Sequence, residues 1–201
     1  GETVRSVMRN VLVARSFSPE DEQRHGIGFL EEVALYAKEL AGATMPDSVT
    51  VAGKTLKLNG MGLRKKAMFK VYVGGLYLEA PASNASAILA SDAPKALKMH
   101  FLRSVDREKL VETFQEGFTA NSPQKAPAQK AGIDKLLATV TDVKDGSVTT
   151  YSYAPGTGTV VNRDGKDVAT IEGKEFAEVL FSLWLGPKPP SEDLQKGLLG
   201  R

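Results

Sequence analysis

The segment from Ala67 to Glu79 limits the possible folds of this chain more than any other part. Its residues alternate between two faces, as they do in a strand. Both faces are largely apolar, with Phe69, Val71, Val73 and Tyr77 on one and Met68, Tyr72, Leu76 and Leu78 on the other. Strands that are apolar on both faces are covered on both sides. We therefore predict a central strand here, in a chain whose 201 residues and 42% hydrophobic content suit a substantial core.

The residues just before this strand offer a candidate anion site. Gly60-Met61-Gly62 predicts a turn, and Arg64 follows it. An arginine keeps its charge in proteins, so at the start of an apolar strand it is a suitable anchor for an anion that reaches into an apolar interior. The alternative is that Arg64, Lys65, Lys66 and Lys70 form a solvated basic turn.

Composition excludes several classes of function. The net charge of +2 suggests neither a nucleic-acid partner nor an anionic membrane surface. Cysteine is absent, which excludes disulfides, thiol catalysis and cysteine-ligated metals. His25 and His100 are the two histidines and lie in unrelated contexts, so we expect no histidine metal site or triad, and no cofactor. No apolar run is long enough for a transmembrane segment.

Residues 1–44 are predicted to form a helical N-terminal extension, and residues 45–201 the main domain. Val4, Val7, Met8 and Val11 follow helical spacing, Ser18-Pro19 is typical of a helix start, and a second apolar face follows, with Phe29, Val33, Tyr36, Ala37 and Leu40. Ala41-Gly42-Ala43 resembles a signal-peptide cleavage site, but the charged residues ahead of it favour an extension over a leader. The extension could instead act as a lid or a partner-binding helix.

The remainder of the chain alternates between strand and helix patterns. Val49–Ala52 and Thr55–Leu58 flank Gly53-Lys54 as a hairpin, and Leu97 to Phe101 is a strand with one buried face. Helices are predicted at 83–90, 106–118, around 133–140, at 176–184 and after Pro190, and short strands at 147–153, 158–162 and 168–171. This order predicts an α+β fold with a mainly antiparallel sheet.

Three blocks of sequence resemble the chalcone isomerase-like superfamily, in particular its bacterial branch. The first is Leu58–Glu79, the second is Asp92–Arg103 with the helical 106–118, and the third is 182–200, which contains Trp184-Leu-Gly-Pro187 and Gly197-Leu-Leu-Gly200. The resemblance covers the chain from about Val49 to the end. It implies an open-faced β-sandwich, a large sheet packed against a layer of helices, with a ligand cleft between the two.

The plant isomerases of this superfamily surround an arginine with a threonine, a tyrosine and an asparagine that organise the substrate carbonyl and a water. By resemblance, Arg64 matches the arginine, Tyr72 stands at the threonine position, and Asp106 and Thr113 stand at the tyrosine and asparagine positions. Ser182 or Leu183 occupies the last active-site position, with a one-residue ambiguity. Most of the catalytic set is therefore missing, together with the carbonyl stabilisation that usually dominates such catalysis.

The fatty-acid-binding members of the superfamily keep the arginine and place a tyrosine where the enzymes have threonine. Arg64 and Tyr72 reproduce that pair, which implies a carboxylate held by a guanidinium and a phenol. Arg103, which continues a buried strand face, is a competing anchor. Besides Thr113, the candidate cleft-lining residues, each of which could equally be ordinary core, are Met68, Leu76, Phe101, Leu110, Phe114, Leu180 and Trp184.

The sequence thus predicts a non-catalytic chalcone isomerase-like protein that binds a fatty acid or a similar amphipathic carboxylate. One alternative is an isomerase-type lyase with weak activity. Another is a structural or partner-binding domain with a filled interior and residues 1–44 as its interaction surface. The habit of the bacterial relatives favours a periplasmic location, and no pattern in the chain indicates an oligomeric state.

Overall fold

The computed structural model describes residues 9–13 and 35–201, and the chain divides into two compact units, Gly1–Asp47 and Ser48–Arg201. In the first unit, strands β1 (Arg9–Val13), β2 (Leu35–Leu40) and β3 (Ala43–Pro46) form an antiparallel sheet in the order β1-β2-β3.

The prediction of helix for the N-terminal extension is wrong wherever the structure tests it, at 9–13, 35–40 and 43–44. Ala41 and Gly42 both have positive φ, 52° and 87°, which is the backbone of a tight two-residue hairpin turn. This turn folds β3 back on β2, so the residues whose apolar spacing also fits a helix form strands instead. The predicted helix start at Ser18 and the residues Val4, Val7, Met8, Phe29 and Val33 lie outside the described residues.

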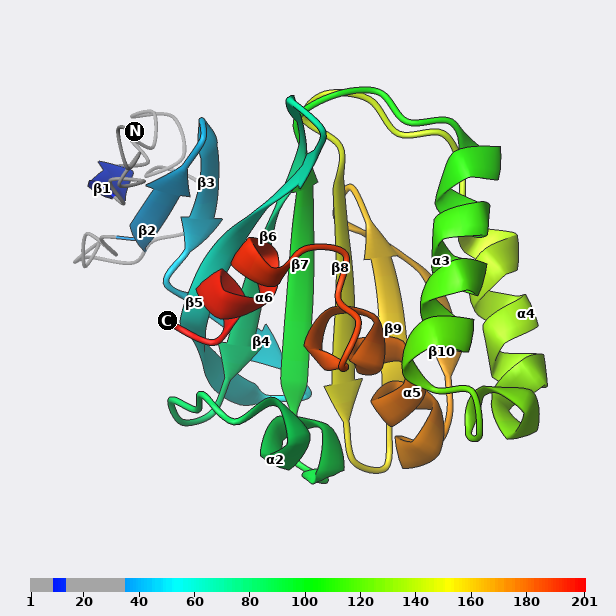
Figure 1. Ribbon diagram of the computed structural model, residues 1–201. Coiled ribbons are helices and arrows are strands. Elements are labelled where there is room, and N and C mark those ends of the chain that lie inside the picture. The colour runs from blue at the N-terminus through cyan, green and yellow to red at the C-terminus, as the bar shows by residue number, and fades with distance from the viewer. Residues whose placement is uncertain (1–8, 14–34) are drawn as a thin grey trace, which may run out of the picture. The chain divides into compact units, whose positions relative to one another are not determined.

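A seven-stranded antiparallel sheet dominates the second unit (Figure 1). Its spatial order is β10-β9-β8-β7-β6-β5-β4. The strands are β4 (Ser48–Val51), β5 (Lys54–Lys66), β6 (Phe69–Leu78), β7 (Lys95–Phe101), β8 (Val148–Ala154), β9 (Gly158–Arg163) and β10 (Lys166–Ile171). Strands that follow each other in the sequence are therefore neighbours in this sheet, including β7 and β8, which pair although a long helical segment separates them in the chain.

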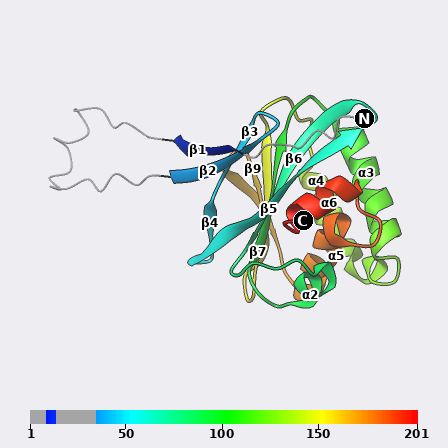
Figure 2. The same ribbon diagram turned by 60° about the vertical axis from the view of Figure 1, so that its left-hand side comes forward.

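Five α-helices lie together on one side of this sheet (Figure 2). They are α2 (Ala85–Ala90), α3 (Arg107–Asn121), α4 (Lys130–Thr139), α5 (Lys174–Leu185) and α6 (Glu192–Leu198), with a 3-10 turn, η1 (Ala126–Gln129), ahead of α4. The most buried is α5, in which every residue from Val179 to Leu185 is inaccessible to solvent or nearly so. The prediction of an α+β fold with a large antiparallel sheet packed on helices is confirmed. No helix among the described residues is long and apolar enough to cross a membrane.

Strand β6 is the central strand that its two apolar faces predicted. Tyr72, Leu76 and Leu78 face the main core, which the helices close. Tyr77 faces a smaller cluster with Leu56 and Ala96 on the opposite side of the sheet. The sheet curls so that β4, at its edge, contacts β8, and this curl covers the second face.

Gly60 and Gly62 are not in a turn, contrary to the sequence prediction; both lie within β5, and Arg64 is near the end of that strand rather than at the beginning of the next. The glycines are needed because α6 crosses β5 at backbone distance. A Cβ on Gly60 would lie 2.1 Å from the Gly197 carbonyl oxygen, and one on Gly62 would lie 2.3 Å from that of Leu194. The C-terminal helix is thus seated directly on β5.

We expect Gly62→Ala to lower the free energy of unfolding by about 3 kcal/mol or more, because a backbone carbonyl cannot move aside as a side chain can. Gly74→Ala is the matched control: Gly74 is the cross-strand partner of Gly62, but its Cβ would meet side chains rather than backbone, those of Leu194, Leu198 and Tyr72 at 3.3, 3.4 and 3.8 Å. Urea unfolding followed by the fluorescence of the single tryptophan measures both. Equal losses would contradict this packing of α6.

Lys95 is a buried lysine at the other end of the sheet. Its side chain is 3% exposed, its ammonium donates to the Ile88 and Ser91 carbonyls at the end of α2 at 2.9 and 2.7 Å, and it lies over the Tyr153 ring. Burial lowers the pKa of Lys95 to about 8, which the nearby Asp92 carboxylate only partly counteracts. The carbonyls at the end of α2 therefore accept hydrogen bonds from the Lys95 ammonium, whose charged form is disfavoured by burial.

Because the folded-state pKa of Lys95 is below the unfolded value, the unfolded chain binds more protons between about pH 8 and pH 10. Lys95 alone therefore makes stability rise with pH in this window, by up to about 1.4 kcal/mol per pH unit, whereas buried tyrosines such as Tyr72, whose folded-state pKa is raised to about 12, oppose the rise as the pH approaches 10. Lys95→Met should flatten the rise, though not abolish it, because burial also lowers the pKa of Lys98. Urea midpoints of the wild type and Lys95→Met at about pH 8 and about pH 9, below the range in which tyrosines titrate, measure this slope. An unchanged slope in Lys95→Met would contradict the assignment.

Candidate ligand-binding site

Arg64 and Tyr72 are directly opposite each other on the neighbouring strands β5 and β6. Opposite residues of an antiparallel pair project from the same face with their Cβ atoms about 5 Å apart. The two residues that the resemblance paired are therefore placed together by the strand register. Arg64 is partly buried, and Tyr72 is 7% exposed and part of the main core.

The Tyr72 hydroxyl is held by a hydrogen bond from the helical layer. The indole Nε1–H of Trp184, on α5, donates to the Tyr72 oxygen at 3.1 Å. Burial raises the pKa of Tyr72 to about 12, an effect that the Trp184 hydrogen bond and the nearby charge of Arg64 only partly offset. The phenol is thus neutral at physiological pH. Since its oxygen accepts from Trp184, its own proton remains to be donated to another acceptor.

Two cavities meet at this pair. The inner one, of about 240 Å³, lies between β6, β7 and helices α3 and α5, and has Phe114, Leu183 and Trp184 in its wall. The outer one, of about 320 Å³, extends toward the β5–β6 turn and has Phe69, Phe101 and Arg103 in its wall. Both are lined by Arg64, Tyr72, Leu110, Thr113 and Pro190. Together they fall in the roughly 300–1,000 Å³ range of small-molecule sites.

Aromatic rings form the closed end of the inner cavity. Trp184 packs on Tyr151 with ring centroids 5.6 Å apart, and Phe114 meets both rings edge-on at 6.4 Å. Tyr72 in turn packs on Phe101 at 5.7 Å. These contacts join α3, α5 and three strands of the sheet around the site, so the Tyr72 hydroxyl is held by a rigid apolar frame.

Most of the residues predicted to line the site are in the cavity walls. Phe101, Leu110, Thr113, Phe114 and Trp184 line one or both cavities with Arg64 and Tyr72. Thr113 is exposed on α3, and its hydroxyl donates to the Lys109 carbonyl at 2.8 Å.

Three predicted lining residues lie elsewhere. Leu76 and Leu180 are fully buried in the core and line neither cavity, because they pack directly between sheet and helices. Met68 is 86% exposed, because the strand begins at Phe69 and Met68 belongs to the preceding turn, next to Ala67 with φ 53°.

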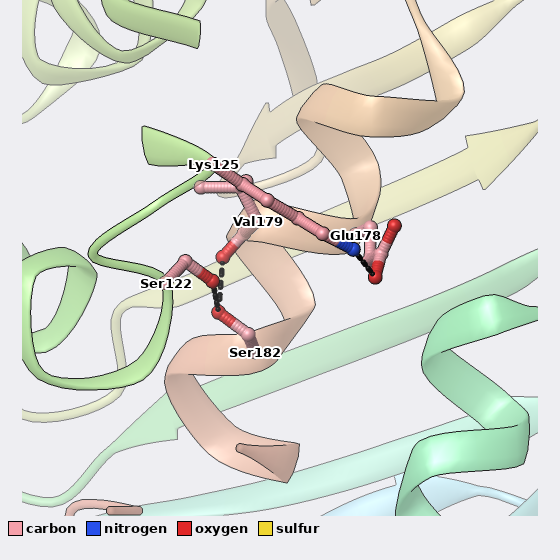
Figure 3. A network of polar contacts seen from close by, with 5 residues as sticks. All are labelled: Ser122, Lys125, Glu178, Val179 and Ser182. Carbon is pink, nitrogen blue, oxygen red and sulfur yellow. Dashed lines mark hydrogen bonds and ion pairs between the residues drawn. The ribbon is translucent and has the colours of Figure 1, made fainter. Parts of the chain in front are cut away.

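Ser182 and Leu183, the two candidates for the last position of the site, direct their side chains to different places. The Ser182 hydroxyl donates to the Val179 carbonyl at 2.7 Å and lies 2.8 Å from the Ser122 hydroxyl, beside the ion pair of Lys125 and Glu178 (Figure 3). Leu183 lines the inner cavity instead. Of the two candidates, it is the apolar Leu183 that contributes to the wall of this cavity.

Several lining residues were missed in the sequence. Gly117 and Ala120 of α3 line the inner cavity, as do Lys188 and Pro190 in the connection from α5 to α6. A Cβ on Gly117 would lie 2.6 Å from Leu183, so this glycine lets α3 approach α5. The helical spacing of Gly117 and Ala120 with the predicted Leu110, Thr113 and Phe114 could have revealed the α3 residues. No local pattern marks Lys188 or Pro190.

The site is therefore an apolar pocket with hydrogen-bond donors at its middle. Arg64 and Tyr72 supply those donors where the two cavities meet. The Arg64 guanidinium also donates to the Lys65 carbonyl and has no carboxylate partner within salt-bridge distance among the described residues. Nor does the described part of the chain hold a cluster of His, Asp and Glu side chains suited to a metal ion.

The model of the chalcone isomerase-like family matches residues 37–200, which is most of the chain. The chain belongs to this family. Among solved structures, it is similar to a fatty-acid binding protein of Arabidopsis thaliana, AtFAP1, with a TM-score of 0.63 and 16% sequence identity. That match covers 79% of this chain and 92% of the other, and at this identity it shows the shared fold. No curated protein sequence matches the chain.

The Trp184–Tyr72 hydrogen bond should be measurable as a coupling energy. Tyr72→Phe leaves a buried indole N–H without its acceptor, and Trp184→Phe removes the donor and some packing. We expect the double variant to be more stable than the sum of the two losses implies, by about 1 kcal/mol. Chemical denaturation of the four proteins, followed by circular dichroism, tests this. Additive losses would show that the bond contributes no stability.

Proposed function

We propose that this chalcone isomerase-like protein is a non-catalytic carrier that binds a fatty acid, or a similar amphipathic carboxylate, with the head group on Arg64 and Tyr72. The observation that supports this most strongly is the cross-strand placement of a guanidinium, which has no carboxylate partner in the described part of the chain, beside a neutral phenol that has a proton to donate. A carboxylate accepts from both: a guanidinium fork matches its two oxygens, and the phenol adds a third hydrogen bond.

The two ends of such a ligand contribute differently. About ten buried methylenes contribute roughly 8 kcal/mol at ~0.8 kcal/mol each. A charge-assisted hydrogen bond adds about 1.5–3 kcal/mol, and association costs on the order of 4–15 kcal/mol. The apolar walls, with Leu110, Phe114 and Leu183, therefore supply most of the affinity. Arg64 and Tyr72 select the head group and fix its orientation.

The chemistry of the cavity walls supports binding without turnover. By resemblance, Asp106 stands at the family's catalytic tyrosine position, so a carboxyl side chain replaces the phenol that the enzymes use there. Leu183, one of the two candidates for the family's last active-site position, adds a purely apolar side chain to the cavity wall. The similar AtFAP1 is, by its title, a fatty-acid binding protein. The two cavities also count against the alternative of an interior filled by side chains.

We expect Arg64→Ala to weaken the binding of dodecanoate, which has about ten methylenes, by roughly 10- to 100-fold, because a charge-assisted contact is lost. The variant should also lose the preference for dodecanoate over dodecanol, since the neutral alcohol needs no guanidinium. Isothermal titration with both ligands measures the two effects.

Two further variants define the anchor. Arg201→Ala, which removes an exposed guanidinium at the chain end, is the charge-matched control and should bind like the wild type. Arg103→Ala tests the competing anchor in the outer cavity. A larger loss of dodecanoate affinity in Arg103→Ala than in Arg64→Ala would move the head-group site to Arg103. Turnover of a chalcone above buffer background, abolished by Arg64→Ala, would favour the isomerase alternative instead.

We also propose a bacterial origin and a periplasmic location, on the habit of the relatives that the sequence resembles. Both stay predictions, and fractionation of cells that express the native gene tests the location.

A further inference from the structure

The turn between β5 and β6 presents two apolar side chains to solvent. Met68 is 86% exposed and Phe69 is 54% exposed, and among the described residues no other large hydrophobic side chain is as exposed. They are consecutive, at the tip of a hairpin whose strands are 13 and 10 residues long. An exposed apolar pair of this kind, next to polar residues, is typical of an interaction site.

Basic side chains surround this tip. Lys65, Lys66 and Lys70 are exposed, and Lys65 is directly opposite Lys70 in the β5–β6 register. Like charges directly opposite each other destabilise a sheet. None of the three lysines forms a salt bridge with another described residue. A negatively charged surface would convert this unfavourable arrangement into a favourable one.

Arg103 adds a fourth cation. Its guanidinium lies 4.5 Å from the centre of the Phe69 ring, so charge and apolar surface are stacked at the tip. The acidic residues nearest to this patch come from α3 and its start. The charge of Lys66 helps to lower the pKa of Glu112, but the carboxylate of Glu112 is already paired with Lys109. Asp106 lies in the wall of the outer cavity. From Arg64 to Leu78 the hairpin contains no acidic residue.

The tip is continuous with the candidate ligand site. Lys66, Phe69 and Arg103 line the outer cavity, which leads to Arg64 and Tyr72. The β5–β6 turn lies at the same end of the sheet as the connections that follow β7 and precede β8 (Figure 1). Backbone hydrogen bonds join these segments there, from the Leu102 N–H to the Val71 carbonyl and between Val105 and Val143. The mouth of the cavity therefore opens beside the exposed apolar pair.

We propose that the β5–β6 tip docks on the surface of an anionic lipid bilayer. Met68 and Phe69 enter the boundary between head groups and acyl chains, and Lys65, Lys66, Lys70 and Arg103 contact lipid phosphates. Neither signal suffices alone, because stable attachment to a membrane surface takes an apolar anchor and a polybasic patch together. The net charge of +2 concealed this patch, because acidic residues elsewhere in the chain balance it.

Docking in this way places the mouth of the outer cavity against the lipid surface, so that a fatty acid passes between bilayer and protein without crossing water. This role in exchange rests on the proposed function, whereas the docking itself depends only on the tip. Each basic residue near an anionic bilayer strengthens attachment about fivefold at moderate salt.

Sedimentation of the full chain with lipid vesicles tests the docking. We expect binding to phosphatidylcholine vesicles that contain about 30% phosphatidylglycerol, weakened by salt, and little binding to pure phosphatidylcholine. Met68→Ser with Phe69→Ser, and separately Lys66→Glu with Lys70→Glu, should each lower the partition coefficient by about tenfold or more. Lys57→Glu with Lys130→Glu changes the charge equally at exposed lysines outside the patch and should cost far less.

Three results would overturn the proposal. One is wild-type protein that ignores anionic vesicles, and another is tip variants that bind them as the wild type does. The third is a wild-type oligomer that Met68→Ser with Phe69→Ser converts to monomer in light scattering, which would make the tip a protein–protein interface. Arg64→Ala separates the two proposals: it should still bind vesicles even though its affinity for dodecanoate is weakened.

Discussion

The antiparallel pairing of β5 with β6 is the interaction on which the rest of the structure depends. Its register sets Arg64 against Tyr72, which creates the polar centre of the site, and Gly62 against Gly74, which opens the space that α6 occupies. Its turn carries Met68 and Phe69 into solvent beside the outer cavity. A slip of one residue would turn every side chain of one strand to the other face and would remove all three features together.

The helical layer adds what the sheet cannot provide. Trp184, on α5, holds the Tyr72 hydroxyl by a hydrogen bond, and Phe114, on α3, packs edge-on against the Tyr151 ring. Burial keeps the phenol neutral, so on the proposed function an anionic head group would meet the Arg64 guanidinium and one fixed hydrogen-bond donor in a largely apolar cleft. Binding energy would then come from the walls and selectivity from Arg64 and Tyr72, a division that suits the proposed carrier better than a catalyst.

The sequence predicted what depends on local pattern. Two apolar faces placed β6 in the middle of the sheet, and resemblance paired Arg64 with Tyr72 before any register was known. Prediction from sequence failed where a contact between distant parts of the chain decides the structure. Gly60 and Gly62 were predicted to form a turn because α6, the helix whose close packing requires these glycines, lies more than 130 residues away. In residues 35–46 the turn at Ala41-Gly42 outweighed an apolar spacing that also suits a helix. For the same reason, no local pattern revealed that Trp184 bonds Tyr72, or that Lys188 and Pro190 reach the cavity.

Mass spectrometry of an organic extract from the purified, denatured protein tests the central claim most directly, with Arg64→Ala prepared in parallel. If Arg64 and Tyr72 hold a carboxylate in the cleft, the wild type should release a fatty acid in near-stoichiometric amount and Arg64→Ala should release much less. Equal amounts of fatty acid from both proteins, or a neutral lipid unaffected by the substitution, would contradict a carboxylate anchored on Arg64.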